Sequence, residues 1–133
     1  MNLKTLYEEA LRASQKSYSP YSSFPVGAAV LLADDTIVTG TNIENRSYGL
    51  TNCAERTAIF TAAAMGHRTF KAIAIAAPKA DYPVSPCGAC RQVMSEFADA
   101  SVPVVFGSSW ENRVETTIGK LFPFDSLHEL SEK

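Results

Sequence analysis

The chain has 133 residues, 46% of them hydrophobic, which suits one folded domain over residues 1–133 and excludes a disordered chain or a disulfide-stapled miniprotein. Its 12 basic and 14 acidic residues give a net charge of −2 without a basic run, so we expect no nucleic-acid partner. We also expect a cytoplasmic protein with no membrane partner, because no apolar stretch reaches the roughly 18 residues of a membrane span and no signal peptide is evident.

The N-terminal third of the chain predicts a helix followed by a β-hairpin. Apolar residues recur at helical spacing from Leu3 to Tyr18, with charged residues between them, as in an amphipathic helix. Segment 19–25 contains two prolines and predicts a loop. Short apolar runs at 26–33 and 37–41 flank an Asp-Asp-Thr turn, which is the pattern of two hairpin strands.

The remainder of the chain alternates helices and strands. Asn52 can cap a helix over residues 53–65, which Gly66 would end. The elements predicted after it are a buried strand at 72–77, a helix at 87–98, strands at 102–106 and 113–116, and a helical turn at 118–121. Repeated strand–helix–strand units indicate an α/β fold, in which a sheet with parallel strands carries helices on its faces.

Three cysteines carry most of the chemical information in the sequence. Cys53 lies at the start of one predicted helix, and Cys87 and Cys90 lie three residues apart in the first turn of another. This spacing puts the second pair on one helix face, and helix N-termini favour the thiolate form. Helices that follow parallel strands start at the same sheet edge, so the three thiolates would converge there as a zinc site.

The number of ligands favours catalytic over structural zinc. Structural zinc usually has four protein ligands, whereas catalytic zinc keeps one position for water and lowers the pKa of that water to about 7. His67 follows the end of a predicted helix and His128 lies in the charged tail. We therefore expect both histidines at the surface and neither as a fourth ligand.

A carboxylate and two cations stand close to the cysteines in the sequence. Glu55 comes two residues after Cys53, where it can act as a general acid and base. Three thiolates on Zn²⁺ carry a formal charge of −1, which Arg56, Arg91 or both could moderate.

Each of these features also has a purely structural interpretation. Glu55 could be the capping-box partner of Asn52, and Ser85 could be an N-cap that precedes a proline. The second cysteine pair could be a redox C-x-x-C, and Cys53 could be a core residue. The ordered combination of C-x-E and P-C-x-x-C at two helix starts favours the zinc site over these separate interpretations.

The chain resembles the cytidine deaminase family, specifically its small homotetrameric type with three cysteine ligands. The segments that carry the resemblance are 21–28 (YSSFPVGA), 42–45 (NIEN), 53–56 (CAER) and 86–92 (PCGACRQ). C-x-E with P-C-x-x-C marks the deaminase superfamily, and N-I-E-N indicates its nucleoside branch. The resemblance implies an α/β fold of three layers, an α/β/α sandwich with a mixed sheet of about five strands.

The resemblance also implies roles for individual residues. One Zn²⁺ per chain would be bound by Cys53, Cys87 and Cys90, with Glu55 as the general acid and base. The implied substrate contacts are Asn42 and Glu44 to the ribose, Phe24 to the pyrimidine, and the backbone of Ala54 and Ser85 to its edge.

Two further aromatic residues are implied to reach the site of a neighbouring subunit in the homotetramer. They are Tyr48 and, near the C-terminus, Phe124. The segment after Pro123 is shorter than is usual in the family, so Phe124 could instead be a hydrophobic anchor for the tail.

The implied function is hydrolytic deamination of cytidine and deoxycytidine to uridine and deoxyuridine, with release of ammonia, in pyrimidine nucleoside salvage. The residues support a free nucleoside independently, because Asn42 and Glu44 suit ribose hydroxyls and the carboxylate would repel a phosphate. A plain polar turn remains the other interpretation of that segment. Two other functions stay open, namely deamination of a blasticidin-type nucleoside analogue and a non-catalytic zinc or redox domain.

Overall fold

A mixed sheet with strand order β2-β1-β3-β4-β5 forms the centre of the computed structural model, which describes residues 2–130. The strands are β1 (Gly27–Leu32), β2 (Ile37–Thr41), β3 (Phe70–Ala76), β4 (Pro103–Gly107) and β5 (Val114–Thr117). Strands β3 and β4 are parallel, whereas β1 is antiparallel to both of its neighbours and β5 is antiparallel to β4. It follows that β2, β3 and β4 run in the same direction. The predicted mixed sheet of five strands is confirmed.

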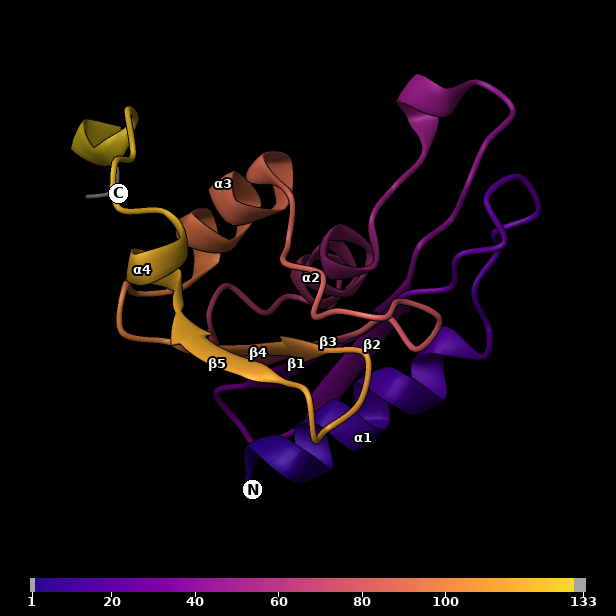
Figure 1. Cartoon of the computed structure of the whole chain (residues 1–133). Helices are drawn as coiled ribbons and strands as arrows, with labels where there is room; N and C mark the ends of the chain where they lie inside the picture. The colour runs from indigo at the N-terminus through magenta and orange to yellow at the C-terminus, as the bar shows by residue number, and fades with distance from the viewer. Residues whose placement is uncertain (1, 131–133) are drawn as a thin grey trace.

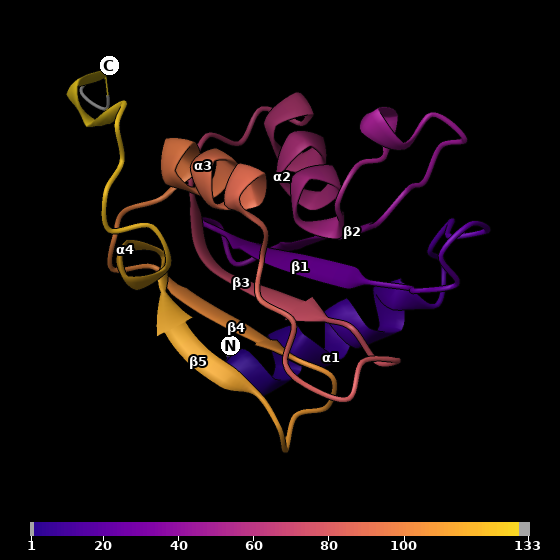
Figure 2. The ribbon, with the colours of Figure 1, turned by 45° about the horizontal axis from the view of Figure 1, so that its top comes forward.

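Helices cover both faces of this sheet. They are α1 (Leu3–Ser14), α2 (Ala54–Ala64), α3 (Gly88–Phe97) and α4 (Ile118–Leu121), with 3-10 turns η1 (Tyr48–Leu50) and η2 (His128–Leu130). Helix α1 lies on one face, while α2 and α3 lie side by side on the other and α4 sits near β5 (Figures 1 and 2). This arrangement confirms the three-layer α/β/α architecture. No helix within residues 2–130 is both long enough and apolar enough to span a membrane.

Alternation of large and small side chains in β3 sets the thickness of the two outer layers. Ile73 and Ile75 belong to the core cluster under α2 and α3, whereas Ala72, Ala74 and Ala76 belong to the cluster under α1. Successive strand residues point to opposite faces. The Ala-Ile repeat therefore places small side chains between the sheet and α1, and larger ones between the sheet and the opposite helices. Helix α1 consequently lies close to the sheet.

Two element boundaries differ from the sequence expectation by two residues or more, and the others agree to within one residue. Helix α1 ends at Ser14, so the helical spacing up to Tyr18 was a wrong prediction for its last turn. Tyr18 instead pairs with Ile43 in a parallel β-bridge, which draws the chain away from the helix axis. Strand β3 begins at Phe70, two residues early, because Phe70 pairs with Leu32 beyond a register shift in β1.

Candidate active site

Strand direction brings the starts of α2 and α3 to one edge of the sheet. Helix α2 follows β2 and α3 follows β3, and these two strands run the same way. Cys53 is the N-cap residue of α2 and Cys87 is the N-cap residue of α3, each with extended backbone. Cys90 then follows in the first turn of α3, where it is fully buried.

The three sulfur atoms form a cluster whose size fits one zinc ion. The Sγ atoms of Cys53 and Cys87 are 4.0 Å apart, those of Cys87 and Cys90 are 3.4 Å apart, and all three lie within 4.8 Å of one another. Tetrahedral zinc with Zn–S bonds of about 2.3 Å requires sulfur separations of about 3.8 Å. The donor set is therefore the right size and chemistry for Zn²⁺. Neither His67 nor His128 belongs to this cluster.

The two candidate arginines make different contacts. Arg56 donates from Nη2 to the Sγ atom of Cys53 over 3.2 Å. Arg91 donates instead to the carbonyl oxygens of Pro86 and Leu121 and to the hydroxyl of Ser85, at 2.8, 2.9 and 3.1 Å. Arg56 thus offsets thiolate charge directly, whereas Arg91 ties the loop before α3 to the end of α4.

Hydrogen bonds to Cys53 stabilise its thiolate. The neighbouring Cys90 thiol and the Arg56 guanidinium, which donates to the sulfur over 3.2 Å, lower the pKa of Cys53 to about 5. The sulfur of Cys87 also accepts the N–H of Cys90, over 3.4 Å. Ligand sulfurs at helix starts, supported by a cation, are suited to binding a divalent metal.

Glu55 lies in the first turn of α2, beside the sulfur cluster. Its side chain is only 5% exposed, and this burial raises the pKa of the carboxyl group to about 7. The capping-box interpretation does not hold, because the N-cap residue of α2 is Cys53 and the N–H of Asn52 donates to Ile43. A buried carboxyl group next to a metal cluster is a common arrangement for moving protons in catalysis.

The loop before α3 does not begin that helix with a Ser-Pro cap. Its N-cap residue is Cys87, so Ser85 and Pro86 precede the cap. Ser85 is exposed and its Oγ atom accepts from Arg91, whereas Pro86 is buried. The backbone of Ser85 is therefore held beside the cysteines rather than inside a helix. Ala54, the first residue of α2, is fully buried.

Asn42 is buried and almost fully hydrogen-bonded. Its Oδ1 atom accepts from the hydroxyl of Ser17 and from the N–H of Val26, and its Nδ2 atom donates to the carbonyl of Phe24 over 2.8 Å. An amide nitrogen has two N–H groups, so one of them is not used by these contacts. Asn42 holds the 24–26 segment in place and retains one donor for a ligand.

Glu44 lies on the same side of the extended 42–44 segment as Asn42, because side chains alternate along extended backbone. Its Oε1 atom accepts from the N–H groups of Tyr21 and Ser22, at 3.0 and 3.1 Å, and its Oε2 atom accepts from the Ser22 hydroxyl. These bonds, the Ser22 hydroxyl first, lower the pKa of Glu44. Ser17 and Ser22 were not predicted as site residues, and their only signal in the sequence is a serine-rich segment.

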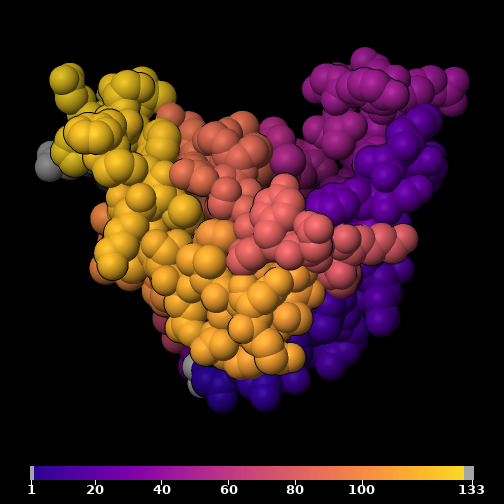
Figure 3. Space-filling model, viewed as in Figure 1, coloured from indigo at the N-terminus to yellow at the C-terminus, as the bar shows by residue number. Residues whose placement is uncertain are grey.

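The remaining predicted contacts come from exposed loops. Phe24 is half-buried, while Tyr48 is 78% exposed and lies 6.4 Å, centroid to centroid, from the ring of Tyr21. Figure 3 shows two projections on this side of the molecule, the loop around η1 in purple and the C-terminal segment in yellow, with α3 between them. Phe124 in that C-terminal segment is 91% exposed.

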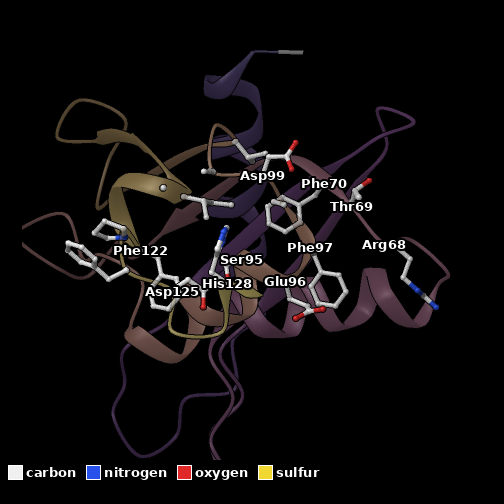
Figure 4. A pocket seen from close by; sticks show the side chains of 17 residues that line it. Arg68, Thr69, Phe70, Ser95, Glu96, Phe97, Asp99, Phe122, Asp125 and His128 are labelled. Atoms are coloured by element: carbon white, nitrogen blue, oxygen red, sulfur yellow. The ribbon is translucent and has the colours of Figure 1, made fainter. Parts of the chain in front are cut away.

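A groove of about 1120 Å³ separates α3 from α4 and the C-terminal segment. Phe97 of α3, Phe122, Phe124 and His128 are among the residues that line it, and Figure 4 shows three of them around the hollow. None of its lining residues is a cysteine, and Glu55 is not among them. The groove is therefore a feature separate from the sulfur cluster.

Comparison with known proteins gives the family. The family model described as "Cytidine and deoxycytidylate deaminase zinc-binding region" matches residues 1–106, which include all three cysteines and Glu55. The chain belongs to this family of deaminases. Family membership and the three-sulfur geometry agree on one zinc ion per chain.

Individual relatives and structures share most of the chain. A cytidine deaminase of Sporosarcina psychrophila is 51% identical over 123 residues, covering 92% of this chain and 90% of that protein. The crystal structure of cytidine deaminase from Burkholderia pseudomallei matches with a TM-score of 0.88 and 46% identity, covering 92% of this chain and 98% of the other. A blasticidin-S deaminase of Bacillus cereus is 35% identical over 106 residues, covering 74% of each chain.

Proposed function

We propose that the chain is a zinc-dependent cytidine deaminase, which hydrolyses cytidine and deoxycytidine to uridine and deoxyuridine plus ammonia in pyrimidine nucleoside salvage. The observation that carries the proposal is a buried carboxyl group, Glu55, next to three thiolate ligands that leave one zinc position open. Relatives named cytidine deaminase, at about half identity over most of the chain, support the same substrate.

The metal supplies one part of the chemistry, because zinc with an open position lowers the pKa of a water molecule to about 7 when bound. Glu55 supplies the other part. The oxygen of water forms a bond to C4 of cytosine and the bond from C4 to the amino nitrogen breaks. Glu55 takes the two protons of the attacking water in turn and delivers one to N3 and the other to the departing amino group, which leaves as ammonia. Burial of this carboxyl group limits its contact with bulk solvent.

The proposed ribose contacts follow from the hydrogen-bond donors and acceptors of Asn42 and Glu44 that no other part of the protein uses in the described structure. Asn42 retains one N–H, so it can only donate, and the Glu44 carboxylate can only accept. A hydroxyl group both donates and accepts, which makes ribose a complementary ligand. A phosphate offers oxygens alone and would be repelled by Glu44, so we propose a free nucleoside rather than a nucleotide.

The base is proposed to lie between the metal site and Phe24. The Phe24 side chain is half-buried and its backbone is held on both sides, by the Ser22 hydroxyl and the Asn42 amide. Backbone groups at Ala54 and Ser85, at the starts of the two cysteine-bearing segments, would read the edge of the pyrimidine. Arg56 would moderate the thiolate charge, and Arg91 would act through the loop that it anchors.

We further propose that residues 1–133 act as one deaminase domain and assemble as a cytoplasmic homotetramer with shared sites. Large apolar side chains are exposed at the two projections, with Tyr48 at 78%, Leu50 at 70% and Phe124 at 91%. Exposed apolar groups in such number are typical of a surface that another chain covers. Three cysteines used as metal ligands suit a reducing compartment. Light scattering of the zinc-loaded protein tests the tetramer.

The Glu55→Gln variant tests the catalytic proposal. We expect a folded, zinc-loaded protein in which cytidine turnover, followed by ultraviolet absorbance, falls by a factor on the order of 10² or more. Glu8→Gln is the matched control, because Glu8 is an exposed carboxylate on α1, across the sheet, and this variant should turn over like the wild type. Near-normal deamination by Glu55→Gln would contradict the proposed role.

The similarity to a blasticidin-S deaminase keeps a second substrate class as the alternative. Cytidine and blasticidin S can be compared as substrates of the same preparation by ammonia release. Glu44→Gln separates the two, because removing the negative charge should weaken cytidine binding if this carboxylate holds the ribose. An unchanged apparent affinity would show the ribose assignment to be wrong. Zinc binding without ammonia release from either substrate would favour a non-catalytic zinc domain.

A further inference from the structure

The carboxylate of Glu44 is held by a loop that lies more than 20 residues away in the sequence. Three donors reach it, namely the N–H groups of Tyr21 and Ser22 to Oε1 and the hydroxyl of Ser22 to Oε2. A carboxylate has about four lone-pair positions, so one acceptor position is left, on Oε2. The oxygen that remains available to a ligand is thus the one that the Ser22 hydroxyl contacts.

The hydroxyl of Ser22 has a defined direction. Its oxygen accepts the N–H of Phe24 over 3.0 Å, which leaves its hydrogen directed towards Glu44. The two backbone donors bind Oε1, whereas the Ser22 hydroxyl is the one protein donor that holds Oε2 among the described residues. Ser22 therefore holds the oxygen of Glu44 that keeps a lone pair for a ligand, and so helps to fix where that lone pair points.

We propose that Ser22 is a positioning residue that controls how strongly the site recognises the ribose hydroxyls. The inference rests on the proposed function, because it requires Glu44 to accept from the ribose. Ser22 is exposed and belongs to no helix or strand, so its hydroxyl is not needed for the core. It acts on substrate binding through Glu44 and takes no part in the bond-breaking step.

The role predicts a dependence on the substrate. In Ser22→Ala the carboxylate keeps both backbone donors on Oε1 but loses the donor on Oε2, so the oxygen that faces the ligand is less firmly positioned. KM for cytidine should rise about tenfold, the scale of one hydrogen bond to a charged group, with kcat little changed. A nucleoside that lacks the 2′ and 3′ hydroxyls has no vicinal hydroxyl to offer Glu44. KM for 2′,3′-dideoxycytidine should therefore stay within about twofold of its wild-type value.

Two variants in the same loop serve as controls. Ser22→Thr keeps the hydroxyl and should restore the wild-type preference for cytidine over dideoxycytidine. Ser23→Ala removes a neighbouring exposed hydroxyl for which the described residues show no hydrogen-bond partner, and it should leave both KM values unchanged. Zinc content and circular dichroism of each variant report whether the fold is intact.

The experiment measures kcat and KM for both substrates in these variants, in Glu44→Gln and in the double variant Ser22→Ala/Glu44→Gln. In the Glu44→Gln background, adding Ser22→Ala should raise KM for cytidine less than threefold, because the carboxylate that Ser22 positions is already replaced. Equal KM changes for both substrates, or additive effects in the double variant, would overturn the inference and leave the deaminase function standing. A wild-type protein that releases no ammonia from cytidine would instead refute the proposed function.

Discussion

The backbone of α2 packs directly against Gly40 of β2, and replacing this glycine by alanine should disturb the metal site. A Cβ atom at this position would lie 2.4 Å from the backbone nitrogen of Ala58 and 2.8 Å from the carbonyl oxygen of Ala54. Ordinary van der Waals contact begins near 3.4 Å. Because both neighbours are backbone atoms, no side chain can rotate out of the way, and α2 must retreat by about 1 Å.

Two magnitudes follow from that displacement. Overpacking of this kind costs about 1–3 kcal/mol, which lowers Tm by roughly 4–12 °C in a chain of this size. Cys53 and Glu55 move with α2, whereas Cys87 and Cys90 belong to α3. Metal–ligand distances tolerate only about 0.2 Å, and a 1 Å misplacement at a site can reduce a rate by about 10². Gly40→Ala should therefore lose zinc affinity and activity together with stability.

The assay compares Gly40→Ala with Gly49→Ala at equal protein concentration. At Gly49 a Cβ atom would meet nothing within 4 Å, so this variant should keep the wild-type Tm and zinc content. Thermal unfolding by circular dichroism, with and without added zinc, gives Tm, and a competing chelator gives zinc affinity. Wild-type Tm and zinc affinity in Gly40→Ala would refute the close approach of α2 to β2.

The remaining predictions concern the two arginines and the hydrogen bond from Tyr7 of α1 to Gly107 of β4. Arg56→Gln should lower zinc affinity about tenfold in a chelator competition, because it removes the cation that contacts Cys53. Arg91→Gln should instead lower Tm and leave zinc affinity within about threefold of wild type, because Arg91 bonds to backbone carbonyls and not to a ligand sulfur. Tyr7 donates to the carbonyl of Gly107 over 3.0 Å, so Tyr7→Phe should cost about 1 kcal/mol of unfolding free energy at neutral pH. Burial raises the pKa of Tyr7 above 10.0, so the folded state keeps a proton that the unfolded state releases, and this contribution to stability is lost as the pH rises above about 10. The gap in Tm between wild type and Tyr7→Phe should consequently narrow from pH 9 to pH 11, and a constant gap would contradict the assignment.

Local patterns in the sequence determined the elements and the metal donors. Helical and strand periods depend on near neighbours, and the C-x-E and P-C-x-x-C spacings place Cys53, Cys87 and Cys90 at helix starts without reference to the rest of the fold. Shared strand direction then suffices to bring those starts to one sheet edge, as the structure has them. The amphipathic spacing failed only at Tyr18, where a bridge to a distant segment outweighs helical propensity.

Tertiary structure alone decided which side chains support the site. Both Arg56 and Arg91 stand near cysteines in the sequence, yet only the fold shows that one donates to a thiolate and the other to a carbonyl 30 residues away. Likewise, the bond from Ser22 to Glu44 joins two loops, and neither loop has a period that indicates the other. Periodicity records which face of an element is buried, whereas hydrogen bonds between loops depend on how the whole chain brings them together. The three ligands could be inferred from spacing, but the contacts that position their surroundings required the folded chain.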